Sequence, residues 1–108
     1  MLSIVVTTVE GLDDARRLAR AAVEQSLAAC VHLETIESVY FWEGAVQSGV
    51  EYRLSFKSSE QGSERLRLWL GAHHPYALPA LYTLQVSEVD PRYLAWVAEG
   101  SGGRAGVG

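Results

Sequence analysis

Hydrophobic and polar positions alternate along several stretches of the chain in the way that predicts β-strands. Residues 2–8 are mostly apolar and β-branched, which indicates a buried strand. Residues 29–42 form a longer strand-like stretch. Because strands usually run for about five or six residues, we expect a bend or bulge near residues 34–37.

The most regular alternation covers residues 50–57. One face carries Val50, Tyr52, Leu54 and Phe56, and the other carries Glu51, Arg53, Ser55 and Lys57. A period of two with one polar face predicts antiparallel pairing, most simply as a hairpin with the preceding strand. Residues 43–49 would form the turn, and a last strand is expected at 80–86.

Three segments have the apolar spacing of amphipathic helices. Asp13 is placed to cap the first, Ser58 and Gln61 have capping-box spacing for the second, and Pro75 must end that second helix. Asp90 followed by proline predicts the start of the third. The inward stripes are Ala15, Leu18, Ala19 and Ala22, then Leu66, Trp69 and Leu70, then Tyr93, Leu94 and Val97.

This order of elements predicts an α+β, ferredoxin-like split βαβ fold, βαββαβ plus a C-terminal helix, in one domain of residues 1–99. Gly100 should stop the last helix, and residues 100–108 should form a flexible, glycine-rich tail. Two helices would cover one sheet face and leave the other bare. Long central strands would also leave unpaired edges, so we expect strands of several copies to pair or pack together.

Composition narrows the function classes. The 108 residues carry a formal net charge of -4 with scattered basic residues, which argues against nucleic-acid binding. The single cysteine excludes an intrachain disulfide. With no signal-peptide pattern and no apolar run of roughly 20 residues, we expect a cytoplasmic protein that does not enter membranes.

Enzyme motifs are missing from the sequence. Acylphosphatases share the expected fold, but they need a loop arginine after the first strand and a catalytic asparagine. Residues 9–12 contain no arginine, and the chain contains no asparagine. A glycine-rich phosphate loop, a zinc-protease motif and a nucleophile elbow are absent as well, so we expect no catalysis.

Several segments, in order and on the expected elements, resemble the CutA-type divalent-cation tolerance proteins over roughly residues 3–99. They are residues 27–31, residues 38–46, Glu51, Lys57, residues 74–76, Pro79 and residues 93–96. The resemblance implies a PII-like homotrimer whose extended central strands interlock around a three-fold axis. It also implies binding of divalent metal, copper(II) above all, and a role in metal tolerance.

Four side chains are candidate metal ligands: His74, His73, Cys30 and His32. His74 is the first candidate, because Pro75 fixes the backbone beside it, whereas the adjacent His73 is expected to point away. Imidazole suits copper(II), nickel and zinc, and a Cys-x-His pair on one strand face suits a softer metal. The alternatives are a helix-end histidine near the helix dipole, a histidine on a sheet face or interface, and a buried cysteine that acts as a small apolar residue. We expect Cu(II) or another divalent cation as the ligand, and no metal requirement for folding.

Aromatic and charged residues indicate a second kind of site. Trp42, Tyr76, Tyr40, Glu51 and Lys57 could line a pocket between subunits. The alternatives are core or interface packing for the aromatic residues and a polar strand face for the charged ones. A PII-like regulator or scaffold that binds a small molecule or protein in such clefts is therefore the alternative function. Ala77 and Ala80 favour it, because they stand where the CutA-type proteins carry oxygen donors.

Overall fold

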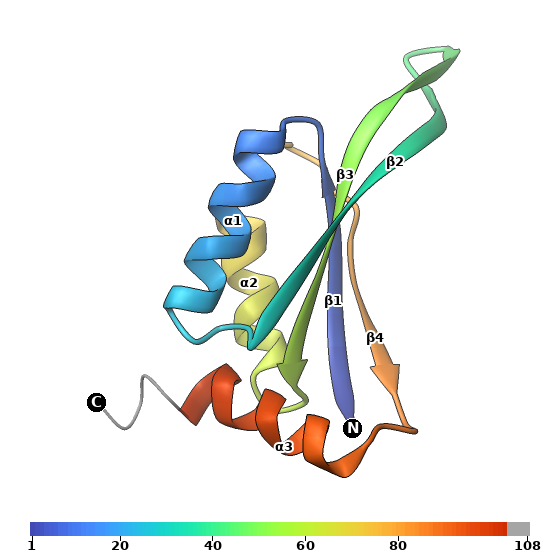
Figure 1. Cartoon of the computed structure of the whole chain (residues 1–108). Coiled ribbons are helices and arrows are strands. Elements are labelled where there is room, and N and C mark those ends of the chain that lie inside the picture. The colour runs from blue at the N-terminus through green and yellow to red at the C-terminus, as the bar shows by residue number, and fades with distance from the viewer. Residues whose placement is uncertain (104–108) are drawn as a thin grey trace.

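The computed structural model describes residues 1–103 as a four-stranded antiparallel sheet with helices packed against it (Figure 1). The elements are β1 (Leu2–Val9), α1 (Leu12–Glu24), β2 (Cys30–Trp42), β3 (Ala45–Ser59), α2 (Ser63–His73), β4 (Leu81–Val86), α3 (Pro91–Ala98) and the π-helical turn η1 (Glu99–Gly103). The strands lie in the order β2-β3-β1-β4. The predicted split βαβ fold is confirmed.

The main core lies between the sheet and the pair α1 and α2, which cover the same face (Figure 1). Its strand residues come from alternate positions because successive side chains point to opposite faces. The core consists of Val5 and Val9, Leu54 and Phe56, Ala15, Leu18, Ala19 and Ala22, Leu27 and Ala28, and Leu66 and Leu70. The predicted helix stripes are therefore largely those that pack.

The opposite sheet face is not left entirely bare, which corrects the prediction. Leu2, on the other side of β1 from Val5, packs with Ala29 and with Val97 of α3. Figure 1 shows α3 across the end of the sheet where the chain begins. The third helix therefore shields that end, and the uncovered surface is concentrated toward the other end.

The β2–β3 hairpin extends well beyond the rest of the sheet (Figure 1). β1 pairs with β3 only as far as Val9 opposite Tyr52, whereas β2 and β3 stay paired out to Trp42 opposite Ala45. We call residues 36–51 the projecting hairpin. Its two outer faces both expose apolar side chains: Val39 (68% exposed), Phe41 (71%) and Val46 (72%) on one face, with Tyr40 and Trp42 on the other.

Two expectations for this hairpin are wrong. The pairing of β2 with β3 is continuous, with no bulge at residues 34–37. The turn consists of Glu43 and Gly44 alone, both with positive φ, as tight hairpins between right-twisted strands require. Residues 45–49, expected in the turn, therefore belong to β3.

Two predicted helix caps are also wrong. Asp13 lies inside the first turn of α1, whose N-cap is Gly11. Ser58 belongs to β3, and α2 has Gly62 as its N-cap with no capping side chain, so Ser58 and Gln61 form no capping box. The strand continues because β1 offers a partner at each position up to Ser59.

The third helix begins as predicted, with the Asp90 carboxylate accepting a hydrogen bond from the backbone of Arg92. Its C-terminal side departs from the expectation. The chain turns on past Gly100, and Ser101 is only 2% exposed. The Ser101 hydroxyl accepts the backbone N–H of Ser59 at 2.9 Å. Packed structure thus extends past residue 100, and the rest of the expected tail, residues 104–108, lies outside the described residues.

Candidate functional site

The two adjacent histidines lie where α2 ends and the chain crosses toward β4. His73 is the last residue of α2, whereas His74 is extended, with φ -71° and ψ 139°. Proline disfavours helical geometry in the residue before it, so Pro75 forces this change between the two histidines. Their side chains therefore enter different surroundings.

The His74 imidazole uses both ring nitrogens within the chain. Nδ1 accepts a hydrogen bond from the backbone N–H of Tyr76 at 3.0 Å, so the proton of the neutral ring is on Nε2. Nε2 lies 2.9 Å from the Thr7 hydroxyl and 3.0 Å from the Thr8 carbonyl. Burial lowers the pKa of His74, which favours this neutral form. No lone pair of His74 remains free for a metal ion in this arrangement.

The His73 imidazole, in contrast to that of His74, uses only one ring nitrogen in a hydrogen bond within the chain. Its Nδ1 lies 2.8 Å from the Trp69 carbonyl oxygen, which can only accept, so Nδ1 carries the proton. The ring stacks on Trp69 with centroids 4.8 Å apart. Nε2 of the neutral, exposed ring therefore keeps its lone pair, and a metal-binding histidine usually has its other nitrogen held by such an oxygen.

A polar cluster joins the segment after α2 to the base of the projecting hairpin. One carboxylate oxygen of Glu51 accepts the hydroxyl of Tyr76 at 2.9 Å, and the other accepts the hydroxyl of Ser38 at 2.6 Å. Burial, and then the bond to Glu51, raise the pKa of Tyr76. Tyr40 is two positions from Ser38 on β2 and shares its strand face. Glu51, Tyr76 and Tyr40, three of the five predicted pocket residues, thus lie near one another.

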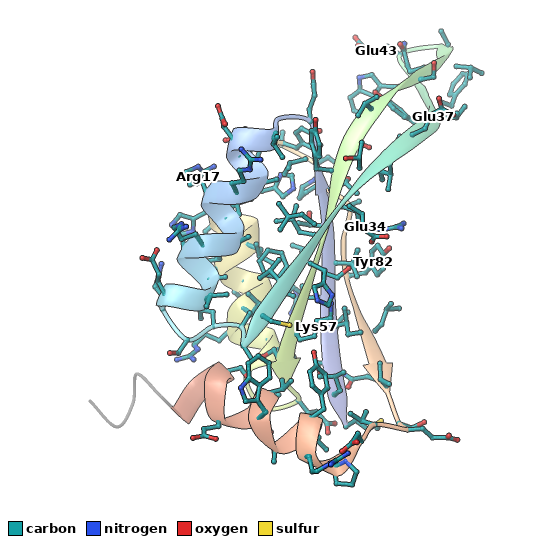
Figure 2. All side chains as sticks on the ribbon, in the orientation of Figure 1. Arg17, Glu34, Glu37, Glu43, Lys57 and Tyr82 are labelled. Atoms are coloured by element: carbon teal, nitrogen blue, oxygen red, sulfur yellow. The ribbon has the colours of Figure 1, made fainter. Side chains whose placement is uncertain are left out.

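The other two predicted pocket residues lie elsewhere in the chain. Trp42 is the last residue of β2, beside the hairpin turn. Lys57 faces Cys30 at the other end of the sheet, about 20 Å from Glu51 at roughly 3.3 Å per strand residue. Figure 2 shows Lys57 near the end of the sheet that α3 covers, far from Glu37 and Glu43 on the projecting hairpin. A single chain therefore does not assemble the five residues into one pocket.

Cys30, His32 and Lys57 form a second cluster on the sheet face that α3 partly covers. Cys30 and His32 are two positions apart on β2 and share that face. The Lys57 Nζ lies 2.6 Å from Nδ1 of His32, and the Tyr93 hydroxyl of α3 lies 3.5 Å from the Cys30 sulfur. The predicted Cys-x-His pair therefore exists, with a lysine ammonium beside it.

Two contributors to these clusters, Thr7 and Ser38, were not among the residues predicted from the sequence. Thr7 is buried in β1. Its hydroxyl donates a hydrogen bond to the Ala80 carbonyl at 2.6 Å and accepts one from Nε2–H of His74. Ser38 shares the strand face of Tyr40 by alternation, and this pattern could have indicated Ser38 as a site residue.

Within residues 1–103, no three His, Cys, Asp or Glu side chains gather closely enough to hold a metal ion.

None of the helices in the described part of the chain has the length and apolar character needed to span a bilayer.

Comparison with known proteins gives consistent matches along almost the whole chain. The family model described as CutA1 divalent ion tolerance protein matches residues 3–100. The divalent-cation tolerance protein CutA of Thermus thermophilus is 35% identical over 103 residues, which are 94% of this chain and 100% of that protein.

Solved structures agree in fold. The structure of CutA from Synechococcus elongatus has a TM-score of 0.86 at 40% identity, covering 89% of this chain and 86% of the other. The PII-like protein CutA of Nostoc, solved in apo form, has a TM-score of 0.86 at 34% identity, covering 92% and 96%. The fold is thus shared with proteins at substantial sequence identity.

Proposed function

The chain belongs to the CutA family of divalent-cation tolerance proteins, and from this premise we propose that it binds divalent metal ions, copper(II) among them, as a homotrimer. The observation that carries the proposal is the projecting hairpin, whose two outer faces are both apolar and uncovered in one chain. A soluble protein rarely leaves such surface open, so sister copies are the natural cover.

Assembly would also complete the metal site. Because the described residues of one chain offer no group of three donors, a tightly held ion needs donors from more than one copy. His73 is the donor that we assign, since its Nε2 is exposed and free. His74 acts instead as the support that holds residues 74–76 against β1.

A cytoplasmic location fits the free thiol of Cys30, which persists best in a reducing compartment.

Light scattering coupled to size exclusion tests the assembly. The wild type should have about three times the 11.8 kDa mass of one chain. Replacing the cross-strand partners Phe41 and Val46 with lysine should break the assembly, because charges would then lie on the buried face. Leu68→Lys, at an exposed position of α2, is the matched control and should keep the wild-type mass. A monomeric wild type would remove the proposal.

Calorimetric titration with Cu²⁺ tests the donor. We would use a Cys30→Ser background, so that the thiol neither binds nor reduces the metal. His73→Ala should weaken binding, whereas His32→Ala in the same background should not. If Cu²⁺ released no heat with the Cys30→Ser protein in which His73 is intact, the proposal of metal binding would be overturned. Unchanged affinity in His73→Ala would overturn the donor assignment.

A further inference from the structure

The Glu51 carboxylate, at the base of the projecting hairpin, carries a negative charge that no basic group neutralises. One of its oxygens accepts the Tyr76 hydroxyl at 2.9 Å, and the other accepts the Ser38 hydroxyl at 2.6 Å. Both donors are neutral, and no lysine, arginine or histidine within residues 1–103 forms an ion pair with Glu51. The two hydroxyls therefore fix the orientation of the carboxylate and leave its charge unbalanced.

The titratable groups around Glu51 add no positive charge. His74 is neutral, because its Nδ1 accepts the backbone N–H of Tyr76 and burial lowers its pKa. Burial raises the pKa of Tyr76 most, and the bond to Glu51 and then the charges of Glu51 and Glu10 raise it further. Glu10 likewise has no ion-pair partner in the described part of the chain. The surface around Tyr76 is therefore one that attracts cations.

Aromatic rings lie beside the same carboxylate. Tyr76 reaches it through its hydroxyl, and its ring lies against that of His74 with centroids 4.9 Å apart. Tyr40 follows Ser38 by two positions on β2 and shares its strand face, where half of Tyr40 is exposed. The faces of such rings carry partial negative charge and attract cations. Carboxylate and rings thus favour the same kind of ligand.

We propose that Glu51, together with the rings of Tyr76 and Tyr40, binds a small organic cation of the alkylammonium class. The ammonium group donates hydrogen bonds to the lone pairs of the carboxylate that the two hydroxyls leave free. The methylene groups next to the nitrogen share its positive charge and lie against the rings. A metal ion does not fit these residues, because it needs several donors and Glu51 is a single carboxylate.

This site goes beyond the proposed function, because its ligand is not a metal ion and its three residues come from one chain. Phe41 and Val46, whose replacement tests the assembly, lie on the other face of the hairpin. The experiment measures ligand affinity, whatever mass light scattering gives for the protein. The two proposals therefore fail separately.

Butylammonium chloride is the probe, titrated into the metal-free, ¹⁵N-labelled full chain and followed by amide chemical shifts. Sodium chloride at equal ionic strength accounts for screening, and 1-butanol presents the same alkyl chain without a charge. Wild type should show saturable shifts at Ser38, Glu51 and Tyr76 with butylammonium and with neither control. Shifts no larger than those with sodium chloride would overturn the proposal.

Glu51→Gln keeps the shape of the side chain and removes its charge. It should weaken butylammonium binding by about tenfold, because a charge-assisted hydrogen bond becomes a neutral one. Glu43→Gln is the matched control, since it removes the same charge from the hairpin turn (Figure 2), roughly 20 Å from Glu51 along β3 at about 3.3 Å per residue. Its affinity should equal that of wild type. Equal weakening in both variants would indicate a response to net charge alone and would refute the site.

Tyr40 tests the contribution of the rings at an exposed position, where substitution leaves folding intact. Tyr40→Leu should weaken binding by about two- to fivefold, as expected for a cation–π contact near the surface. Tyr40→Phe keeps the ring and should bind like wild type. If the leucine and phenylalanine variants bound equally well, the role of this ring would be refuted.

Discussion

Thr7→Val removes one hydroxyl from the contact between β1 and the segment after α2. In the wild type this hydroxyl donates a hydrogen bond to the Ala80 carbonyl and accepts one from Nε2–H of His74. Valine has nearly the same shape, so the substitution removes two hydrogen bonds without opening a cavity. The change therefore isolates the polar contact that holds His74.

The expected loss of unfolding free energy depends on which hydrogen bonds His74 and Ala80 can still form without the Thr7 hydroxyl. His74 retains the Thr8 carbonyl as an acceptor, and Ala80 is exposed, so water can reach its carbonyl. Two hydrogen bonds of about 1 kcal/mol each, partly replaced in this way, predict a destabilisation of about 1–2 kcal/mol. With a urea slope of about 1–3 kcal/mol/M, the unfolding midpoint should fall by roughly 0.3–2 M.

Urea unfolding followed by circular dichroism is the assay, at one protein concentration because assembly makes the midpoint concentration-dependent. Thr35→Val is the control. Thr35 is exposed on β2, and its substitution should stay within about 0.5 kcal/mol of wild type. A Thr7→Val midpoint equal to that of the control would refute a structural role for the Thr7–His74 contact.

Three further predictions concern the surroundings of the site. Ser101→Ala should destabilise the protein by about 1–3 kcal/mol in the same assay, because the buried N–H of Ser59 loses its acceptor; wild-type stability would contradict this packing. Tyr76→Phe should cost about 1 kcal/mol, and a cycle with Glu51→Gln should show the two effects to be coupled rather than additive. With metal chelated, stability should fall as pH drops below about 6.5, because the pKa of His74 is lowered in the folded protein and the unfolded chain takes up the proton first. His74→Gln should lose this slope between pH 6.5 and the carboxylate range, and an unchanged slope would assign it to another group.

The fold could be predicted largely from local pattern because its elements bury one face each. The alternation at residues 50–57 predicts which face of β3 packs against the core. The apolar positions of α1 that include Leu18 predict which side of that helix does so. Where the prediction failed, the decisive contact was distant in sequence. Ser58 and Gln61 have the spacing of a capping box, yet Ser58 stays in β3 because Ser3 of β1 lies opposite it. Local spacing contains no information about that partner.

The site was less predictable for the same reason. Glu51 and Lys57 share the polar face of one strand, and alternation does not say that they are too far apart to act together. The contact between Thr7 and His74 joins residues 67 positions apart. The cross-strand position of Lys57 beside the Cys-x-His pair depends on the register of the hairpin, which the misplaced turn at residues 43–49 obscured.

The two neighbouring histidines show how a local backbone constraint can separate chemical roles. Pro75 holds His74 out of the helix, which carries its ring to β1 and commits both nitrogens to the chain. His73 stays helical, and its ring reaches back one turn to the Trp69 carbonyl, which fixes the proton on Nδ1 and leaves Nε2 exposed. The sequence favoured His74 over His73 as the metal ligand, because Pro75 fixes the backbone beside it. The hydrogen bonds distinguish them, since only an unprotonated, uncommitted nitrogen can become a ligand.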